Sequence, residues 1–340
     1  MEPEHNNSNP PEFSKEQLTL LDRLKEKYSA TGQNLDSYLE GLLYADYLDY
    51  WDYIHLDTLL SLQTPRTRFP DEQIFIIYHQ ITELYFKLIR SEIKQVADDA
   101  LPTVSRLIQR FRRINRYLDA LITSFDVMVD GMDREQFLHF RMALLPASGF
   151  QSVQFRLIEI ESTNFSNLLT PDASLKAADD PEPDFASLYT HLYWREGATE
   201  LASGNQTLTL RRFDAKYRNQ MLRAAGNQQF RNLQFKTSQI QPPGTDSGDA
   251  ENDDAETLKL LMRRYDTAVN VNWRLAHYKS AVKYLHRNPE SIAATGGTNW
   301  QKYLPPRFQR RMFFPDLWNS EEKENWGRIW VEHTLKELGQ

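Results

Sequence analysis

Apolar residues recur every three or four positions along most of this chain, and that spacing limits the fold more than any other feature. It runs through residues 71–98 and again through 103–126, in each case over several turns. Because an α-helix has about 3.6 residues per turn, such residues line one face of a helix. Pro70 suits the first position of the earlier helix, and Asp71 and Glu72 suit the positive end of its dipole.

The same pattern covers most of the remaining sequence. Further helical runs are predicted at about 133–145, 149–163, 206–235, 257–287 and 320–338. No alternation of apolar and polar residues, the pattern typical of strands, extends beyond a few positions. The prediction is therefore an all-α fold, a helical bundle.

Three segments lack the helical pattern. Residues 1–12 are polar and contain proline, which predicts a disordered tail. Residues 238–256 combine Pro, Gly, Ser and Asp with almost nothing apolar, and plain disorder in a long mobile loop is favoured there over a partner site. A shorter polar insertion is predicted at about 171–184. We expect one helical domain over 13–340 that carries both insertions.

The chain of 340 residues has no cysteine and eight histidines. Disulfides, thiolate-ligated haem, cysteine-held iron–sulfur clusters and cysteine nucleophiles are therefore excluded, and metal chemistry depends on histidines and carboxylates. The net charge of −7 gives no indication of a nucleic-acid or membrane partner. No apolar stretch approaches the roughly 20 residues of a membrane span, and the polar N-terminus is unlike a signal peptide. We expect a cytoplasmic protein.

The most basic stretch, RLIQRFRRINR at 106–116, lies within a predicted helix. One hypothesis is a patch that binds phosphate or an acidic partner. We favour the solvated face of an amphipathic helix that pairs with nearby carboxylates, because the chain as a whole is acidic.

Two histidines stand on predicted helices beside aromatic residues. His79 follows Phe75 by four residues, so both share one helix face. His277 follows Trp273 by the same interval, and the small residues after it leave room for a flat macrocycle. A neutral imidazole on a helix is a common axial ligand of haem iron. Taken singly, either histidine is more often an ordinary core residue.

Two further patterns suit the binding of a small ligand. Arg141 follows Phe137 by four residues, which suits a carboxylate held by a bidentate pair beside an apolar pocket, although a surface ion pair is the commoner explanation. ATGGT at 294–298 provides a backbone that a ligand can approach closely, or simply a turn. Phosphate-binding, dinucleotide-binding, HExxH and GxSxG motifs are all missing from the sequence.

The order of these pieces along the chain resembles that of the tryptophan 2,3-dioxygenases. The resemblance extends across the core and leaves out the tail and the polar insertions. SGFQSVQFR and the IFIIYHQ block are long and specific, which makes agreement by chance negligible. The motifs that carry the resemblance are YWDYIHLDTLLSLQ (50–63), DEQIFIIYHQITELYFK (71–87), FR (140–141), LLPASGFQSVQFRLIE (144–159), WRLAH (273–277) and TGG (295–297).

The resemblance implies a haem b enclosed by the helical bundle. The histidine of the WRxxH block, His277, would be the axial ligand of the iron, with Trp273 beside it. Ser148 and Gly149 would border the haem and the pocket. His79 of the HQ motif would lie on the distal side, hydrogen-bond the indole N–H and serve as the catalytic histidine.

The resemblance also implies how an aromatic amino acid is bound. Phe75 would line the indole pocket, and Arg141 would bind the carboxylate with Phe137 packed close by. Thr295 would lie over the substrate's ammonium and carboxylate groups. The resemblance further implies an intertwined homotetramer. In such an assembly, a neighbouring subunit would contribute Tyr50, Tyr53 and Ile54 to the site.

The reaction implied is dioxygenation of tryptophan. O₂ adds across the indole C2=C3 bond, both oxygen atoms enter the product, and N-formylkynurenine results. No external reductant is consumed, so no flavin or nicotinamide site is required. Arg141 and Thr295 would orient the substrate.

The sequence departs from the family pattern around the pocket. Pro70 replaces a histidine, and Trp51 and Trp300 stand at positions where glycine is usual. About four extra residues separate His277 from the TGG motif. Because tryptophan fills space that glycine leaves open, these changes should reshape the pocket wall, and both L-tryptophan and a ring-substituted tryptophan stay open as the substrate. Two alternatives also stay open: a haem enzyme that inserts one oxygen into a tryptophan- or tyrosine-like amino acid, and a non-enzymatic haem- or indole-binding protein.

Overall fold

A computed structural model describes residues 13–177, 183–200, 205–240, 249–285 and 310–328 of the chain. These residues form helices joined by turns, with two isolated β-bridges, Leu169 to Leu192 and Thr199 to Gln206. The all-α prediction is therefore confirmed over the described part of the chain. Within these same ranges no helix is long and apolar enough to span a membrane.

The chain divides into two compact units, Met1–Leu62 and Gln63–Gln340. In the first unit Ser14 caps α1 (Lys15–Ser29) and Asn34 caps α2 (Leu35–Leu43), each through its side-chain oxygen. Two short helices follow, α3 (Tyr50–Ile54) and α4 (Leu56–Leu60). None of these four helices contains a buried residue. Residues 13–62 of the first unit thus form helices without burying an apolar core of their own.

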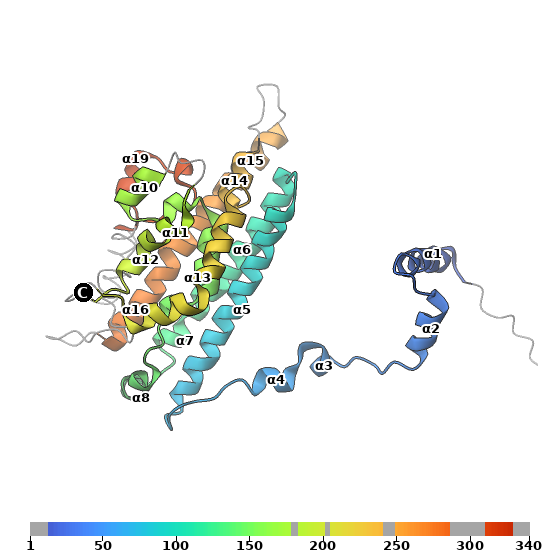
Figure 1. Cartoon of the computed structure of the whole chain (residues 1–340), viewed down its shortest axis with the longest axis horizontal. Coiled ribbons are helices and arrows are strands. Elements are labelled where there is room, and N and C mark those ends of the chain that lie inside the picture. The colour runs from blue at the N-terminus through green and yellow to red at the C-terminus, as the bar shows by residue number, and fades with distance from the viewer. Residues whose placement is uncertain (1–12, 178–182, 201–204, 241–248, 286–309, 329–340) are drawn as a thin grey trace, which may run out of the picture. The chain divides into compact units, whose positions relative to one another are not determined.

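The second unit is built around long helices that run side by side (Figure 1). Helix α5 (Asp71–Asp98) packs against α6 (Val104–Ser124) and α9 (Val153–Ser162). Helix α13 (Leu208–Gln228) packs on α9, and α15 (Asp249–Thr267) packs on α6. The buried residues of α6 show the predicted spacing of three and four: Leu107, Ile108, Phe111, Ile114, Leu118 and Leu121.

Short helices complete the second unit. After α6 come α7 (Asp126–Val129), α8 (Arg134–Phe140), η1 (Arg141–Leu144) and η2 (Gly149–Gln151). Between α9 and α13 lie η3 (Phe165–Leu168), α10 (Pro171–Ala177), α11 (Phe185–Leu188), η4 (Tyr189–His191) and α12 (Tyr193–Glu196). The later short elements are α14 (Leu233–Ser238), α16 (Trp273–Leu285), η6 (Pro315–Leu317) and α19 (Ser320–Glu324).

The predicted helix at 257–287 is longer and less regular than expected. It begins at Asp249, so residues 249–256 are helical where a mobile loop was predicted, and that prediction is corrected there. The acidic residues of this stretch stand at the positive end of the helix dipole, and α15 packs on the arginine-rich α6. A π-helix, η5 (Ala268–Asn272), separates α15 from α16. The domain bounds 13–340 stay a prediction, and the tail at 1–12 lies outside the described residues.

The basic stretch of α6 behaves as a solvated face that pairs with carboxylates. Arg110 and Arg113 contact the two carboxylate oxygens of Glu92 on α5 at 2.8 and 3.2 Å. Arg106 contacts Asp99 at 2.9 Å. These ion pairs confirm the interpretation favoured from the sequence.

Buried Asp266 fastens the segment 310–328 to α15. Its Oδ1 accepts hydrogen bonds from the Phe313 backbone N–H and the Asn270 side chain, both at 2.8 Å. Its Oδ2 accepts from the Phe314 backbone N–H at 3.1 Å and from the Trp318 indole N–H at 3.0 Å. Burial raises the pKa of Asp266. Because all four partners are donors, the ionised carboxylate is the form that fits them.

Candidate active site

His79 lies on the third turn of α5 with its ring against Phe75. The ring centroids are 4.1 Å apart, and the His79 Nδ1–H donates to the Phe75 carbonyl oxygen at 2.7 Å. Because a carbonyl only accepts, this bond fixes the proton on Nδ1 and leaves the lone pair of Nε2 available. His79 retains some contact with solvent, but protein atoms surround its ring. This loss of hydration disfavours the charged imidazolium and lowers the pKa of His79. His79 is thus a neutral hydrogen-bond acceptor.

His277 on α16 has the same local arrangement. Its Nδ1–H donates to the Trp273 carbonyl oxygen at 2.9 Å, so its Nε2 also keeps a lone pair. Burial lowers the pKa of His277 to about 4, with a smaller contribution from the positive charge of Arg274. The imidazole is therefore neutral near pH 7, which is the form that binds a metal ion.

Aromatic rings enclose His277. The ring centroid of Phe125, at the end of α6, lies 4.5 Å from that of His277, and the centroid of Trp273 lies 4.3 Å away. Phe86 of α5 packs edge-on against Trp273 at 5.8 Å. Helices α5, α6 and α16 thus each contribute a ring to the surroundings of His277.

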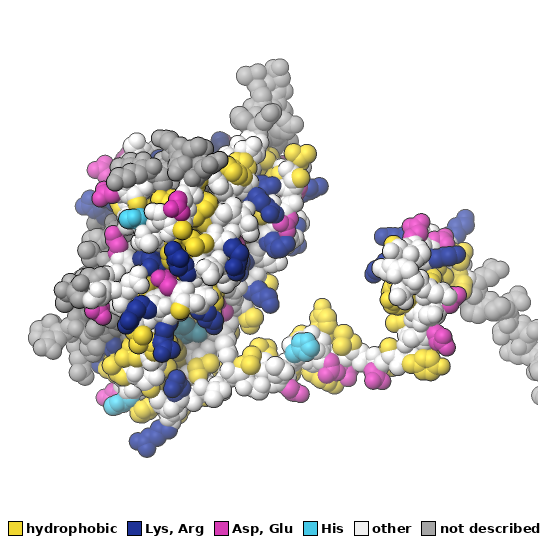
Figure 2. Space-filling view, in the orientation of Figure 1, with side chains coloured by type: hydrophobic (Ala, Val, Ile, Leu, Met, Phe, Trp, Pro, Cys, Tyr) yellow, Lys and Arg dark blue, Asp and Glu magenta, His cyan; other side chains and the backbone are white. Residues whose placement is uncertain are grey.

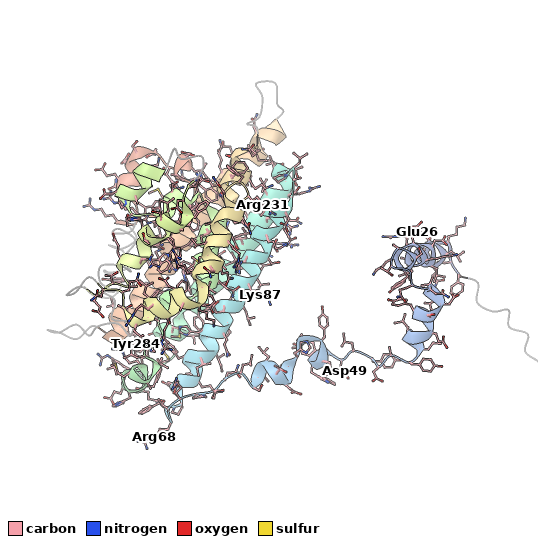
Figure 3. The ribbon with its side chains drawn as sticks, in the orientation of Figure 1. Glu26, Asp49, Arg68, Lys87, Arg231 and Tyr284 are labelled. Atoms are coloured by element: carbon pink, nitrogen blue, oxygen red, sulfur yellow. The ribbon has the colours of Figure 1, made fainter. Side chains whose placement is uncertain are left out.

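Helix α8 adds a second aromatic group beside His79. Phe75 contacts Phe137 and Phe140 at centroid distances of 6.2 and 5.7 Å. Phe137 in turn lies 4.8 Å from Tyr284, whose hydroxyl bonds to the carbonyl oxygens of Val129 and Met132. Figure 3 shows Tyr284 at the end of the second unit where α8 lies. The structure therefore places His79 and Phe137 on either side of Phe75, within ring contact of it.

Arg141 begins η1 one helical turn after Phe137. Its side chain is only 4% exposed, and burial lowers the pKa of its guanidinium. A guanidinium can bind a carboxylate through two parallel hydrogen bonds, so Arg141 has the chemistry that binding the carboxylate of a ligand requires.

The Ser148–Gly149 turn has open space in front of it. The Ser148 backbone N–H donates to Gln151 Oε1 at 3.0 Å, and the Gln151 side-chain N–H bonds to the Thr209 carbonyl oxygen at 3.0 Å, which ties the turn to α13. A Cβ added to Gly149 would meet nothing within 4 Å. A flat group can therefore approach this backbone closely, as a haem edge would.

These residues fit a haem better than a bare metal ion. Within the described ranges, no group of three or more histidine and carboxylate side chains is placed to bind an ion. A single neutral histidine among aromatic rings is a donor set that suits the iron of a haem. The residues present therefore fit the cofactor that the sequence predicts.

Four predicted site residues are not part of this cluster. Tyr50, Tyr53 and Ile54 form α3 in the first unit, where Tyr50 is 70% and Tyr53 73% exposed. Thr295 lies outside the described residues, and so does Trp300. The assignments of these residues stay predictions.

Sequence reasoning missed Phe125, Phe140 and Tyr284. Phe140 could have been found, because it follows Phe137 by three residues on the same helical face. No sequence pattern indicates Phe125 or Tyr284. Phe125 contacts His277, and Tyr284 contacts Phe137, and in both pairs the two residues are about 150 positions apart in the sequence.

Residues 32–168 match the sequence model of the family described as tryptophan 2,3-dioxygenase. The chain is 40% identical over 131 residues to a tryptophan 2,3-dioxygenase of Ruegeria sp. (strain TM1040), which covers 38% of this chain and 46% of that protein. It is 44% identical over 115 residues to one of Herpetosiphon aurantiacus, covering 33% of this chain and 44% of that protein. The chain thus spans less than half the length of these curated relatives. The family match contains the His79 and Arg141 cluster, and His277 follows it in the chain.

Proposed function

We propose that this chain, whose residues 32–168 match the tryptophan 2,3-dioxygenase family, cleaves the indole C2=C3 bond of L-tryptophan, or of a substituted tryptophan, with O₂. The product is N-formylkynurenine. The observation that carries the proposal is the pair of neutral histidines on α5 and α16, each with a free Nε2, beside aromatic rings and buried Arg141.

Haem b is the cofactor that this arrangement supports. His277 would bind it through Nε2, with Trp273 and Phe125 packed around the imidazole and the Ser148–Gly149 turn against the macrocycle. The iron of the bound haem supplies the activation of O₂. The Nδ1–H bond to the Trp273 carbonyl oxygen orients the imidazole and makes it a stronger donor.

His79 and Arg141 would hold the substrate at its two ends. The Nε2 lone pair of His79 accepts the indole N–H, and Phe75 and Phe137 pack against the ring. Arg141 binds the carboxylate, and Thr295 would complete the amino-acid site. Such positioning can account for much of the lowering of the activation barrier, because the reacting atoms are already held in the required orientation.

The first unit supports a homotetramer with shared sites. An isolated short helix is marginal in water, so α2, α3 and α4 need an apolar surface to pack on. Figure 2 shows hydrophobic side chains along this unit. Those that remain more than half exposed include Leu42, Leu43, Tyr44, Tyr47, Leu48, Tyr50, Trp51 and Tyr53. We propose that Tyr50, Tyr53 and Ile54 enter a neighbouring subunit's site, in a cytoplasmic enzyme without a nucleic-acid partner.

Product mass tests the activity directly. The full chain is loaded with haem, reduced without oxygen, and then given O₂ and L-tryptophan. Gain of two oxygen atoms is expected, with His79→Ala strongly slowed and the exposed control His191→Ala unchanged. A product with one added oxygen, or binding of tryptophan without turnover, would overturn the proposal.

A further inference from the structure

The start of α5 is hydrogen-bonded to the start of α8, the helix that carries Phe137. The Asp133 backbone N–H, at the N-cap of α8, donates to Asp71 Oδ2 at 2.5 Å. In the opposite direction, the Asp71 backbone N–H donates to Gln136 Oε1 at 3.3 Å. Figure 1 shows α8 beside the start of α5, and the two helices are in contact. A reciprocal pair of hydrogen bonds thus joins the two helix starts.

Both donors in this pair are N–H groups at helix starts, which have no carbonyl partner within their own helix. The Asp133 side chain accepts from the Gln136 backbone N–H at 2.9 Å, as an N-cap does. The Asp71 carboxylate then satisfies the N–H of the capping residue itself. A side chain of α5 therefore completes the N-terminal cap of α8.

The turn that presents Asp71 is itself firmly held. The carboxylate of the next residue, Glu72, is fully buried and accepts from the backbone N–H groups of Arg66 and Thr67 at 2.8 and 2.7 Å. Just before the turn, the Phe69 ring stacks on the ring of His139 on α8, with centroids 5.3 Å apart and planes at 7°. The start of α5 is thus a fixed support for α8.

Helix α8 leads directly to two of the proposed substrate contacts. Phe137 follows Gln136 in the sequence, and the Arg141 backbone N–H at the end of the helix donates to the Phe137 carbonyl oxygen. Because α8 has only seven residues, about two turns, a shift of its start moves both side chains. A displacement of about 1 Å in a group that positions a substrate can lower a rate about a hundredfold. The placement of α8 therefore matters for the site.

We propose that Asp71 and Gln136 are positioning residues for substrate binding, because they hold the start of α8 and so place Phe137 and Arg141. The inference rests on the proposed function, which assigns Phe137 and Arg141 to the aromatic amino acid. The iron ligand proposed above is on α16, and its ring neighbours come from α5, α6 and α16. Haem binding should therefore be independent of the Asp71–Gln136 pair.

Steady-state kinetics of Asp71→Ala in the haem-loaded full chain tests this role. We expect KM for L-tryptophan to rise about tenfold or more, because α8 loses its support, while the Soret maximum stays in place. Asp71→Asn keeps an oxygen that accepts the Asp133 N–H, so its KM should lie within about twofold of the parent's. A variant that only lost folded protein would lower kcat and leave KM unchanged.

Asp184→Ala is the matched control for the loss of a capping carboxylate. Asp184 Oδ1 accepts from the Ala186 and Ser187 backbone N–H groups at 3.0 and 3.3 Å, at the start of α11. No residue of α11 belongs to the proposed site. KM of Asp184→Ala should therefore equal that of the parent.

Amide hydrogen exchange, measured by mass spectrometry on the haem-free full chain, tests the contact without substrate. Asp71→Ala should speed exchange over residues 134–141 by about fivefold or more, and Asp184→Ala should leave it unchanged there. The inference is overturned if Asp71→Ala keeps the parent's KM, or if its exchange over 134–141 matches the parent's. A parent chain that does not convert L-tryptophan would refute the proposed function instead, and exchange would still decide whether Asp71 holds α8.

Discussion

Replacing Asp266 with asparagine should cost the chain a large part of its stability. The carboxylate accepts four hydrogen bonds, two on each oxygen. Asparagine keeps one of these oxygens and presents an NH₂ group to the other two donors. Each lost bond to a charged group is worth about 1.5–3 kcal/mol, so Asp266→Asn should lower the free energy of unfolding by about 3–6 kcal/mol. Burying the charged carboxylate itself costs free energy, which asparagine avoids. We therefore expect a loss of about 3 kcal/mol in the free energy of unfolding.

Urea unfolding followed by circular dichroism at pH 7 measures this loss. A domain's whole stability is about 5–15 kcal/mol, so the midpoint should move far below that of the parent. Asp119→Asn is the matched control, because its ion pair with Arg264 at 2.7 Å is on the surface and should contribute no more than about 1 kcal/mol. If Asp266→Asn unfolds within about 1 kcal/mol of the parent, the buried carboxylate does not hold residues 310–328 in place.

Four other outcomes follow from the described contacts. His277→Ala should abolish the axially ligated haem spectrum, and a normal spectrum at full occupancy would refute the ligand assignment. Without haem, the pKa of His277 at about 4 lies below its ordinary 6.5, so the unfolded chain binds the extra proton. Stability should then fall as pH falls from 6.5 to 4, by up to about 1.4 kcal/mol per unit, and His277→Gln should flatten this part of a urea–pH series. Arg141→Ala should weaken L-tryptophan binding about tenfold or more while sparing tryptamine, and equal losses by calorimetry would exclude a carboxylate contact. Glu72→Gln should destabilise the turn before α5, where Glu72 accepts from Arg66 N–H, Thr67 N–H and Thr67 Oγ1, and unchanged thermal unfolding would contradict this.

The sequence was sufficient to predict the long helices of the second unit and the aromatic–histidine pairs within them. Those features depend on residues three or four apart, which one helix places on the same face. Phe75 with His79, and Trp273 with His277, are of this kind, and so is the buried face of α6.

Features that depend on distant residues or on backbone irregularity could not be predicted. The helix expected at 149–163 is interrupted at Ser152, whose extended backbone with ψ of 101° caps α9 instead of continuing η2. Residues 249–256 are polar enough for a loop, yet α15 extends through them along α6. The ring contacts of Phe125 and Tyr284 require helices that are far apart in the chain to be packed first.

The π-helix over Ala268–Asn272 sets the register of α16, the helix that carries the proposed iron ligand. A π-turn holds one residue more than an α-turn, and such insertions in natural helices often accompany functional sites. If the same residues formed regular α-helix instead, everything after them would be rotated by about 100°. The imidazole of His277 would then lie on another side of the helix, while α15 and its bonds to residues 310–328 kept their places. The wide turn thus determines which face of α16 presents His277, without adding a side chain of its own to the site.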